Sequence, residues 1–255
     1  MKLMVLSCVH GAAGHRKVIY NHFCTRMEAI RKKYGIEMLV VGSEGEVSEE
    51  ITKKYGHHYL EFTNRPVSNK WNAGMGEIRK HNPTHVMILG SDDFVSDNLI
   101  EGYLEVLATE RFDIIGITDS YYFGLNDKRS KFGVCGYWGG YPKKSIIGYA
   151  RVFNKEILDG LGWKPWIDRK NSGLDFSVNQ RLKQCQLRPR SHRMSIKENG
   201  WLHVDIKTRG NISSMYPLTL EEVDYKELLL KHLPLKEANS IIDYADRYIT
   251  KHKRV

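Results

Sequence analysis

Two adjacent carboxylates follow the most strand-like stretch of the chain. Residues 85–89 form a short apolar run that ends abruptly at Gly90, Ser91, Asp92 and Asp93. Two acids side by side at the end of a buried strand repel each other unless a cation or hydrogen-bond donors compensate them. Carboxylate oxygens, together with phosphate oxygens, are the ligands that Mg²⁺ and Mn²⁺ prefer. The pair therefore predicts a divalent metal site that binds a phosphorylated ligand, whereas the alternative is that Ser91 or Asp93 only caps the following helix.

The elements that must position this pair alternate between strands and helices. Apolar runs predict strands at 2–9, 36–41, 58–62, 85–89 and 113–118. Apolar residues at helical spacing predict helices over 15–34, 47–55, 68–82 (with Ser68 as N-cap) and 100–107. This alternation predicts an α/β fold with a mostly parallel sheet flanked by helices, whose ligands bind outside the carboxyl ends of the strands. The site is then expected near 10–14, 42–44 and 90–93.

The second half of the chain has a different pattern. After Ser120, glycine, aromatic and basic residues follow one another without a clear period, which predicts a loop-rich or antiparallel segment. Helical spacing returns at 154–161 and 172–185, and again in a tail from residue 220 onwards. No internal repeat or linker is present in the sequence, so we expect one domain with a C-terminal helical appendage.

Composition and charge narrow the class of protein. With 41% hydrophobic and 27% charged residues among 255, the chain is typical of a folded globular protein. No apolar run approaches the roughly 18 residues of a membrane span, and the apolar start is too short for a signal peptide, so we expect a cytoplasmic protein without a membrane span. The net charge of +9 favours a polyanionic partner, either a phosphorylated small molecule or nucleic acid; the alternative is a basic, solvated surface.

The sequence at 90–93 resembles the Asp-x-Asp-Asp motif of nucleotide-sugar glycosyltransferases of the GT-A fold, especially the inverting group called family 2. In that family the motif ends a strand and holds Mn²⁺ or Mg²⁺ against the diphosphate of a sugar nucleotide. Here Gly90 replaces the first Asp, so the resemblance implies metal contacts from Asp92 and Asp93 and donor contacts from Ser91 and Asp92. It also implies a GT-A-like catalytic domain at 1–215, with a nucleotide-sugar-binding half at 1–120 and an acceptor-binding half at 121–215, followed by the helical appendage at 216–255.

Other stretches extend the resemblance toward the donor site. Lys70, Asn72 and Gly74 are similar to the family's basic-x-Asn-x-Gly stretch, which implies that Lys70 approaches the diphosphate and Asn72 shapes the donor pocket. The alternative for Lys70 is an ordinary exposed helix lysine. His10 and Gly11 lie in a small-residue loop after the first strand, where the backbone can come close to the donor.

The resemblance also implies a base and further phosphate ligands. Asp175 follows Ser172-Gly173-Leu174, similar to the acid at a helix start that serves as the base in the family. One carboxylate suffices to take a proton from the acceptor hydroxyl, although an acid there could also serve only the helix dipole. The resemblance implies a metal contact from His203 and diphosphate contacts from Lys207 and Arg209. A structural histidine and a solvated basic loop are the alternatives.

The acceptor stays open at this point. Candidate acceptor-binding residues are Tyr137, Trp138 and Arg151. Cations interleaved with planar rings bind phosphates and stack on bases, yet aromatic platforms also hold sugar rings. A saccharide and a hydroxymethylated base in DNA are both compatible, and compact phage-encoded enzymes of similar fold act on such bases in the host cytoplasm.

We therefore expect a metal-dependent glycosyltransferase that moves a sugar from a nucleoside-diphosphate sugar to an acceptor hydroxyl by inverting displacement. Two alternatives belong to other classes: a nucleotidyltransferase acting on a sugar phosphate, and a non-catalytic nucleic-acid-binding protein. Because the sequence contains neither a Gly-x-x-x-x-Gly-Lys-Ser/Thr nor a Gly-x-Gly-x-x-Gly motif, a P-loop NTPase and a Rossmann dehydrogenase are disfavoured.

Overall fold

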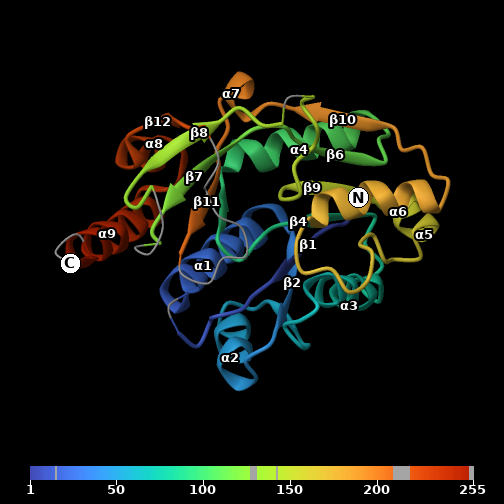
Figure 1. Ribbon diagram of the computed structural model, residues 1–255, viewed down its shortest axis with the longest axis horizontal. Coiled ribbons are helices and arrows are strands. Elements are labelled where there is room, and N and C mark those ends of the chain that lie inside the picture. Colours follow the sequence, from blue (N-terminus) through green and yellow to red (C-terminus); the bar gives the residue numbers. More distant parts are fainter. Residues whose placement is uncertain (15, 127–130, 142, 209–218, 253–255) are drawn as a thin grey trace.

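A mostly parallel sheet forms the centre of the protein. The computed structural model describes residues 1–14, 16–126, 131–141, 143–208 and 219–252 (Figure 1). Within these residues one sheet has seven strands in the order β10-β6-β9-β4-β1-β2-β3. Strands β3, β2, β1 and β4 pair with one another in parallel, as do β6 and β10, and only β9 runs antiparallel, between β4 and β6. The expected mostly parallel sheet is therefore confirmed. Its strands are β1 (Leu3–Cys8), β2 (Glu37–Gly42), β3 (His58–Glu61), β4 (His85–Ile88), β6 (Ile114–Ile117), β9 (Arg151–Asn154) and β10 (Ser191–Met194).

Both faces of this sheet are apolar, and helices cover each of them. Along β1, Leu3 and Val5 belong to one hydrophobic cluster, while Met4 and Leu6 belong to another. Successive side chains of a strand point to opposite faces, so a continuous apolar run needs cover on both sides. The first face packs on α1 (Lys17–Tyr34), α2 (Glu46–Lys54) and α4 (Asp97–Thr109). The second packs on α3 (Val67–Arg79), α5 (Lys155–Gly160) and α6 (Leu174–Gln184).

A second sheet begins where the metal motif ends. It has the order β12-β8-β7-β11-β5, and its strands are β5 (Asp93–Val95), β7 (Ser120–Gly124), β8 (Cys135–Trp138), β11 (His203–Lys207) and β12 (Glu221–Glu222). The pairing of β7 with β8 is antiparallel, as expected for the segment after Ser120. Asp93 opens β5, and Ser96 caps α4 by accepting the N–H of Leu99. The capping role considered for Ser91 or Asp93 is therefore wrong.

After β12, the C-terminal tail forms two helices, of which the second packs on α1. They are α8 (Tyr225–His232) and α9 (Leu235–His252), drawn in red in Figure 1. Glu237 of α9 lies 3.6 Å from Arg26 of α1, and Ala238 and Ile241 join the hydrophobic cluster of the first face. The short helix α7 (Ile196–Asn199) precedes β11. Among the described helices, none combines the length and apolar character needed to cross a lipid bilayer.

Helix α3 approaches the sheet closely at Gly74. A Cβ atom at this position would lie 2.6 Å from Cγ2 of Val41 and 2.7 Å from Cδ1 of Leu6. Carbon atoms prefer separations of about 3.5–4.0 Å, so glycine is required for this approach. The close packing brings Lys70, one turn earlier on α3, to the ends of β1 and β2.

Two glycines of α3 provide a matched test of this packing. We expect Gly74→Ala to destabilise the protein by about 1–3 kcal/mol, because the added methyl group overpacks the contact with β1 and β2. A Cβ atom at Gly76 would have no neighbouring atom within 4 Å, so Gly76→Ala should stabilise the helix by up to about 1 kcal/mol. Urea unfolding of both variants measures the difference. Equal effects at the two positions would contradict the packing argument.

Candidate active site

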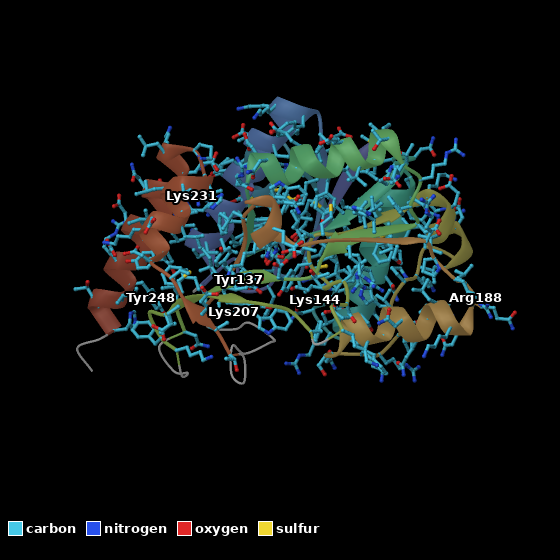
Figure 2. All side chains as sticks on the ribbon, turned by 90° about the horizontal axis from the view of Figure 1, so that it is seen from above. Tyr137, Lys144, Arg188, Lys207, Lys231 and Tyr248 are labelled. Atoms are coloured by element: carbon cyan, nitrogen blue, oxygen red, sulfur yellow. The ribbon has the colours of Figure 1, made fainter. Side chains whose placement is uncertain are left out.

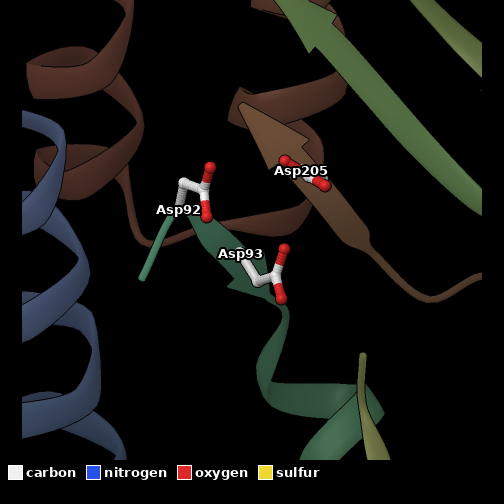
Figure 3. A group of neighbouring side chains, drawn as sticks. All are labelled: Asp92, Asp93 and Asp205. Carbon is white, nitrogen blue, oxygen red and sulfur yellow. The ribbon is translucent and has the colours of Figure 1, made fainter. Parts of the chain in front are cut away.

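Three buried carboxylates meet at the junction of the two sheets. Asp92 lies in the turn between β4 and β5, Asp93 begins β5, and Asp205 comes from β11 (Figure 3). Antiparallel pairing of β5 with β11 puts Asp205 directly opposite Asp93. One oxygen from each of the three carboxylates lies within 4.8 Å of the others. We call Asp92, Asp93 and Asp205 the acidic cluster.

Cations from the same chain contact two members of the acidic cluster. Arg16 Nη2 lies 2.8 Å from Asp92 Oδ1 and donates a hydrogen bond of 3.1 Å to Ser91 Oγ. Lys207 Nζ contacts Asp205 within β11. Both basic side chains are largely buried, as are the carboxylates that they contact. The acidic cluster therefore holds part of its counter-charge internally.

The pKa values within the cluster diverge because the carboxylates have different partners. Burial raises the pKa of Asp205 to about 8, and the charges of Asp92 and Asp93 add to this effect although Lys207 opposes it. Burial would also raise the pKa of Asp93. The neighbouring His203, the N–H of Gly90 at 2.5 Å and the charge of Lys207 outweigh it, and hold the pKa of Asp93 below its usual value. Within the acidic cluster, the pKa is therefore raised at Asp205 and lowered at Asp93.

The chemistry of the acidic cluster fits a divalent cation. Among the described residues, Oδ1 of Asp205 is buried without a hydrogen-bond partner, which is costly unless another ligand satisfies it. Three carboxylates in so small a volume supply the hard oxygen ligands that Mn²⁺ and Mg²⁺ take, and leave room for phosphate oxygens. The residues present therefore fit the metal that the motif predicted, with Asp205 as an additional ligand.

Gly90 is the residue that departs from the Asp-x-Asp-Asp pattern. A Cβ atom there would lie 2.9 Å from Oδ2 of Asp93 and 3.1 Å from Oδ1 of Asp92. A side chain at this position would push the two carboxylates out of place. Glycine at position 90 therefore leaves room for the carboxylates of Asp92 and Asp93.

His203 lies beside the acidic cluster. Its Nε2 is 3.7 Å from Oδ1 of Asp93, beyond a direct hydrogen bond, and has no hydrogen-bond partner among the described residues. Its Nδ1 and Ser120 Oγ are 2.7 Å apart, and its ring stacks on Tyr149 with centroids 4.5 Å apart. His203, Asp205 and Lys207 alternate along β11 and so share one face of the strand. This alternation is the signal from which Asp205 could have been found in the sequence.

Lys70 lies at the ends of the first two strands, near the small-residue loop. Its Nζ donates to Val9 O at 2.5 Å, to Ser43 Oγ at 3.0 Å and to Asn64 Oδ1 at 3.4 Å. It is almost completely buried, and burial lowers its pKa. The alternative of an ordinary exposed lysine is therefore wrong.

The loop that follows β1 lies beside the same strand ends. His10 Nδ1 lies 3.5 Å from Ser43 Oγ, and Gly11 has a φ of 84°, which favours glycine. Arg16 follows the loop, and its Nη1 donates to the carbonyl oxygen of His10 at 3.3 Å. Sequence reasoning missed Arg16, although a basic residue next to a small-residue loop at a strand end was a usable signal.

Asn72 points to a different part of the molecule. Its side-chain amide donates to Trp166 O at 2.8 Å and to Asp168 Oδ1 at 3.0 Å, and it accepts from Trp166 N at 3.2 Å. These bonds fix the 166–168 segment to α3. The donor and acceptor atoms of Asn72 are thus engaged away from the acidic cluster.

Asp175 is the second residue of α6 and packs against Gly148. A Cβ atom at Gly148 would lie 1.8 Å from Oδ1 of Asp175, so the carboxylate occupies the space of a side chain there. The next residue, Tyr149, stacks on His203 beside the acidic cluster. Neighbouring Cα atoms are about 3.8 Å apart, so these two contacts bring Asp175 to the same end of the sheet as the cluster.

Arg151 and Tyr141 lie next to Asp175. Arg151 is buried in β9, and its Nη2 donates to Ile146 O at 2.9 Å. Burial lowers the pKa of Arg151, and the charge of Asp175 opposes that shift. Burial raises the pKa of Tyr141, with further contributions from the charge of Asp175 and a hydrogen bond to it. The charges of Arg151 and Asp175 therefore interact, with Arg151 buried in β9.

A row of aromatic rings runs between His203 and Asp175. Tyr122 meets Tyr149 and Trp138 edge-on, with centroids 6.2 Å and 5.9 Å away, and Trp138 meets Tyr141 at 5.0 Å. We call Tyr149, Tyr122, Trp138 and Tyr141 the aromatic row. The aromatic row connects the ring that stacks on His203 with Tyr141, which lies near Asp175.

Tyr137 lies on the opposite face of β8 from Trp138. Its hydroxyl donates to Asp119 Oδ2 at 2.7 Å, and its ring packs against Tyr121 and Lys197. Adjacent residues of a strand point to opposite faces, so the structure does not bring Tyr137 together with the other site residues. Arg209, expected at the diphosphate, lies outside the described residues.

Comparison with known proteins identifies the fold. No protein-family model matches the sequence, and no curated protein matches it. The structure is similar to a protein of Desulfovibrio desulfuricans G20 described as a nucleotide-diphospho-sugar transferase, with 12% identity over 99% of both chains and a TM-score of 0.51. It is also similar to S. aureus TarS 1–349 in complex with UDP-GlcNAc, with 13% identity, 99% of this chain and 71% of that chain covered, and a TM-score of 0.54. The chain therefore has the GT-A-like fold of nucleotide-diphospho-sugar transferases, as expected.

Proposed function

We propose that this chain, which has the fold of nucleotide-diphospho-sugar transferases, is a metal-dependent glycosyltransferase. It would move a sugar from a nucleoside-diphosphate sugar to an acceptor hydroxyl. The observation that carries the proposal is the buried acidic cluster with its unpartnered Asp205 oxygen among the described residues, at the strand ends where ligands of α/β sheets bind. The complex of the S. aureus neighbour with UDP-GlcNAc supports a donor of this class.

The donor would bind between the loop after β1 and the acidic cluster. Asp92, Asp93 and Asp205 would hold Mn²⁺ or Mg²⁺, which supplies neutralising charge for the leaving diphosphate. Arg16 and Lys207 already contact the cluster, so their positive groups lie where phosphate oxygens would arrive. His10, Gly11 and Lys70 lie at the ends of β1 and β2 on the donor side.

Asp175 would act as the base of an inverting displacement. It takes the proton of the acceptor hydroxyl as that oxygen attacks the anomeric carbon from the face opposite the diphosphate. A new carbon–oxygen bond forms, the bond to the phosphate oxygen breaks, and the nucleoside diphosphate leaves with its electron pair. The positive charge of Arg151, buried in β9, acts on this carboxylate. Trp138 and the rest of the aromatic row would hold the acceptor, either a saccharide or a hydroxymethylated base in DNA.

The products of the donor reaction test this proposal. With Mn²⁺ and a panel of nucleoside-diphosphate sugars, we expect slow release of nucleoside diphosphate in the absence of an acceptor, because water can replace the acceptor hydroxyl. EDTA should abolish the release, and added Mn²⁺ should restore it. Pyrophosphate release from a nucleoside triphosphate and a sugar phosphate would instead identify a nucleotidyltransferase. A protein that turns over none of these substrates would contradict the enzymatic proposal.

A further inference from the structure

The positive charge of the protein is concentrated in one stretch of the chain. Residues 131–208 contain fifteen Lys and Arg against six Asp and Glu, an excess of nine that equals the net charge of the whole chain. The rest of the sequence is neutral on balance. The same stretch carries Asp175 and most of the aromatic row, so part of this excess lies close to Asp175 along the chain.

Four exposed cations flank Asp175 along the chain. Lys143 and Lys144 follow Tyr141, and Arg169 and Lys170 precede α6. None of the four forms an ion pair with a carboxylate of the described residues. We call these four residues the basic rim. Unpaired cations on a surface attract a polyanion at little cost, because no internal ion pair must be broken.

The backbone holds two residues of the basic rim in place. The N–H of Lys170 donates to Ser68 Oγ at 2.9 Å, and the N–H of Arg169 donates to Asn69 Oδ1 at 2.7 Å. This segment therefore connects the first turn of α3 with the start of α6. Lys170 lies five positions before Asp175, a span of at most about 18 Å. Figure 2 shows Lys144 between the second sheet and α6.

Two exposed aromatic rings accompany these cations. Phe176, next to Asp175, is 67% exposed, and Tyr141, whose pKa is raised in part by the charge of Asp175, is 42% exposed. Both rings are largely outside the hydrophobic core. Rings on both sides of a carboxylate can stack on planar groups of a ligand that approaches it.

We propose that the acceptor is a nucleic-acid strand that binds with its phosphates on the basic rim and a base against Tyr141 and Phe176. The inference rests on the proposed function, because Asp175 must be the base. A neutral saccharide would use the rings but not the cations, and a phosphodiester polymer without bases would use the cations but not the rings. Nucleic acid is the ligand class that uses both.

The acceptor hydroxyl would then be carried by a base that leaves the stack. Enzymes that modify a base act on single strands or extrude the target nucleotide, which is then read in a pocket. The aromatic row ends at Tyr141, which lies near Asp175. The base hydroxyl gives its proton to Asp175, its oxygen bonds to the anomeric carbon of the donor sugar, and the nucleoside diphosphate leaves.

Fluorescence anisotropy with a labelled single-stranded DNA oligonucleotide tests the proposal on the full chain. The rim variant replaces Lys143, Lys144, Arg169 and Lys170 with Gln. The control variant replaces four other exposed lysines with Gln, namely Lys53, Lys54, Lys231 and Lys236. The two variants have the same net charge, so only the position of the removed charge differs.

We expect the rim variant to bind the oligonucleotide roughly 10- to 100-fold more weakly, with a salt dependence that is flatter by about one unit for each phosphate that the variant no longer binds. The control variant should stay within about twofold of the wild type on the same scale. The double variant Tyr141→Ala, Phe176→Ala should bind the normal oligonucleotide more weakly but an abasic one unchanged. Equal losses of affinity in the rim and control variants would overturn the proposal, as would equal affinity for normal and abasic strands, which indicates a base-free phosphodiester polymer.

Donor hydrolysis by the wild-type protein distinguishes failure of the acceptor proposal from failure of the proposed function. If the protein releases nucleoside diphosphate but does not bind the oligonucleotide, the acceptor proposal fails and the proposed function stands. If it binds the oligonucleotide but releases no nucleoside diphosphate, both fail and the rim is a plain nucleic-acid-binding surface. Binding that depends on the rim, together with donor hydrolysis, supports both.

Discussion

Replacing Asp205 with Asn is expected to weaken Mn²⁺ binding by at least about 100-fold, which is the upper range for residues that only orient metal ligands. Asp205 faces Asp93 across the strand pair and has the one carboxylate oxygen of the acidic cluster without a partner among the described residues. Nucleoside diphosphate release should fall by about 10²–10³-fold, since charge on the leaving group is no longer neutralised. Titration of Mn²⁺ by electron paramagnetic resonance measures the first effect independently of turnover.

The fold should survive this substitution. Asparagine has nearly the shape of aspartate, its Oδ1 can still accept a hydrogen bond from Lys207, and the substitution removes one of three clustered negative charges. The melting temperature without metal should therefore change little. Asp243→Asn, at an exposed carboxylate of α9, is the matched control and should leave Mn²⁺ binding unchanged. Normal Mn²⁺ affinity in Asp205→Asn would remove this residue from the metal site.

Replacing Asp175 with Asn is expected to reduce nucleoside diphosphate release by about 10²–10⁴-fold, the usual contribution of a general base. The amide keeps the shape that packs on Gly148 but cannot take a proton. Mn²⁺ and donor affinity should persist, because Asp175 is not part of the acidic cluster. The comparison of donor dissociation constant with turnover separates a missing base from a damaged binding site. Turnover equal to that of the wild type would discard Asp175 as the base.

The elements of the first sheet were predictable because their signals are local. Ile19, Phe23, Met27 and Ile30 recur at helical spacing, and the structure buries all four on one face of α1. The helix start at Ser68 was predicted wrongly. Helix α3 begins at Val67, after Pro66, and Ser68 Oγ accepts the N–H of Lys170 instead of capping its own helix. The hydrogen bond to Lys170, which is distant in the sequence, takes the place of the N-cap that the local sequence predicts.

The acidic cluster was predictable only in part. Asp92 and Asp93 stand out because the strand before them ends abruptly. Alternation with His203 and Lys207 marks Asp205 locally, but only the pairing of β11 with β5 brings it opposite Asp93, and that pairing is not visible in the sequence. The different positions of Tyr137 and Trp138 could not be predicted from the sequence either. The sequence did not reveal that they lie on one strand, so it could not reveal that they point to opposite faces.

The contacts of Arg16 with Asp92 and of Lys207 with Asp205 stabilise the protein when no metal is bound. In structural zinc proteins the ion supplies the folding free energy, so chelators denature them. Here guanidinium and ammonium groups of the same chain already balance much of the anionic charge. A divalent ion bound there would therefore exchange with each nucleotide without unfolding the protein, unlike the ion of a structural zinc site.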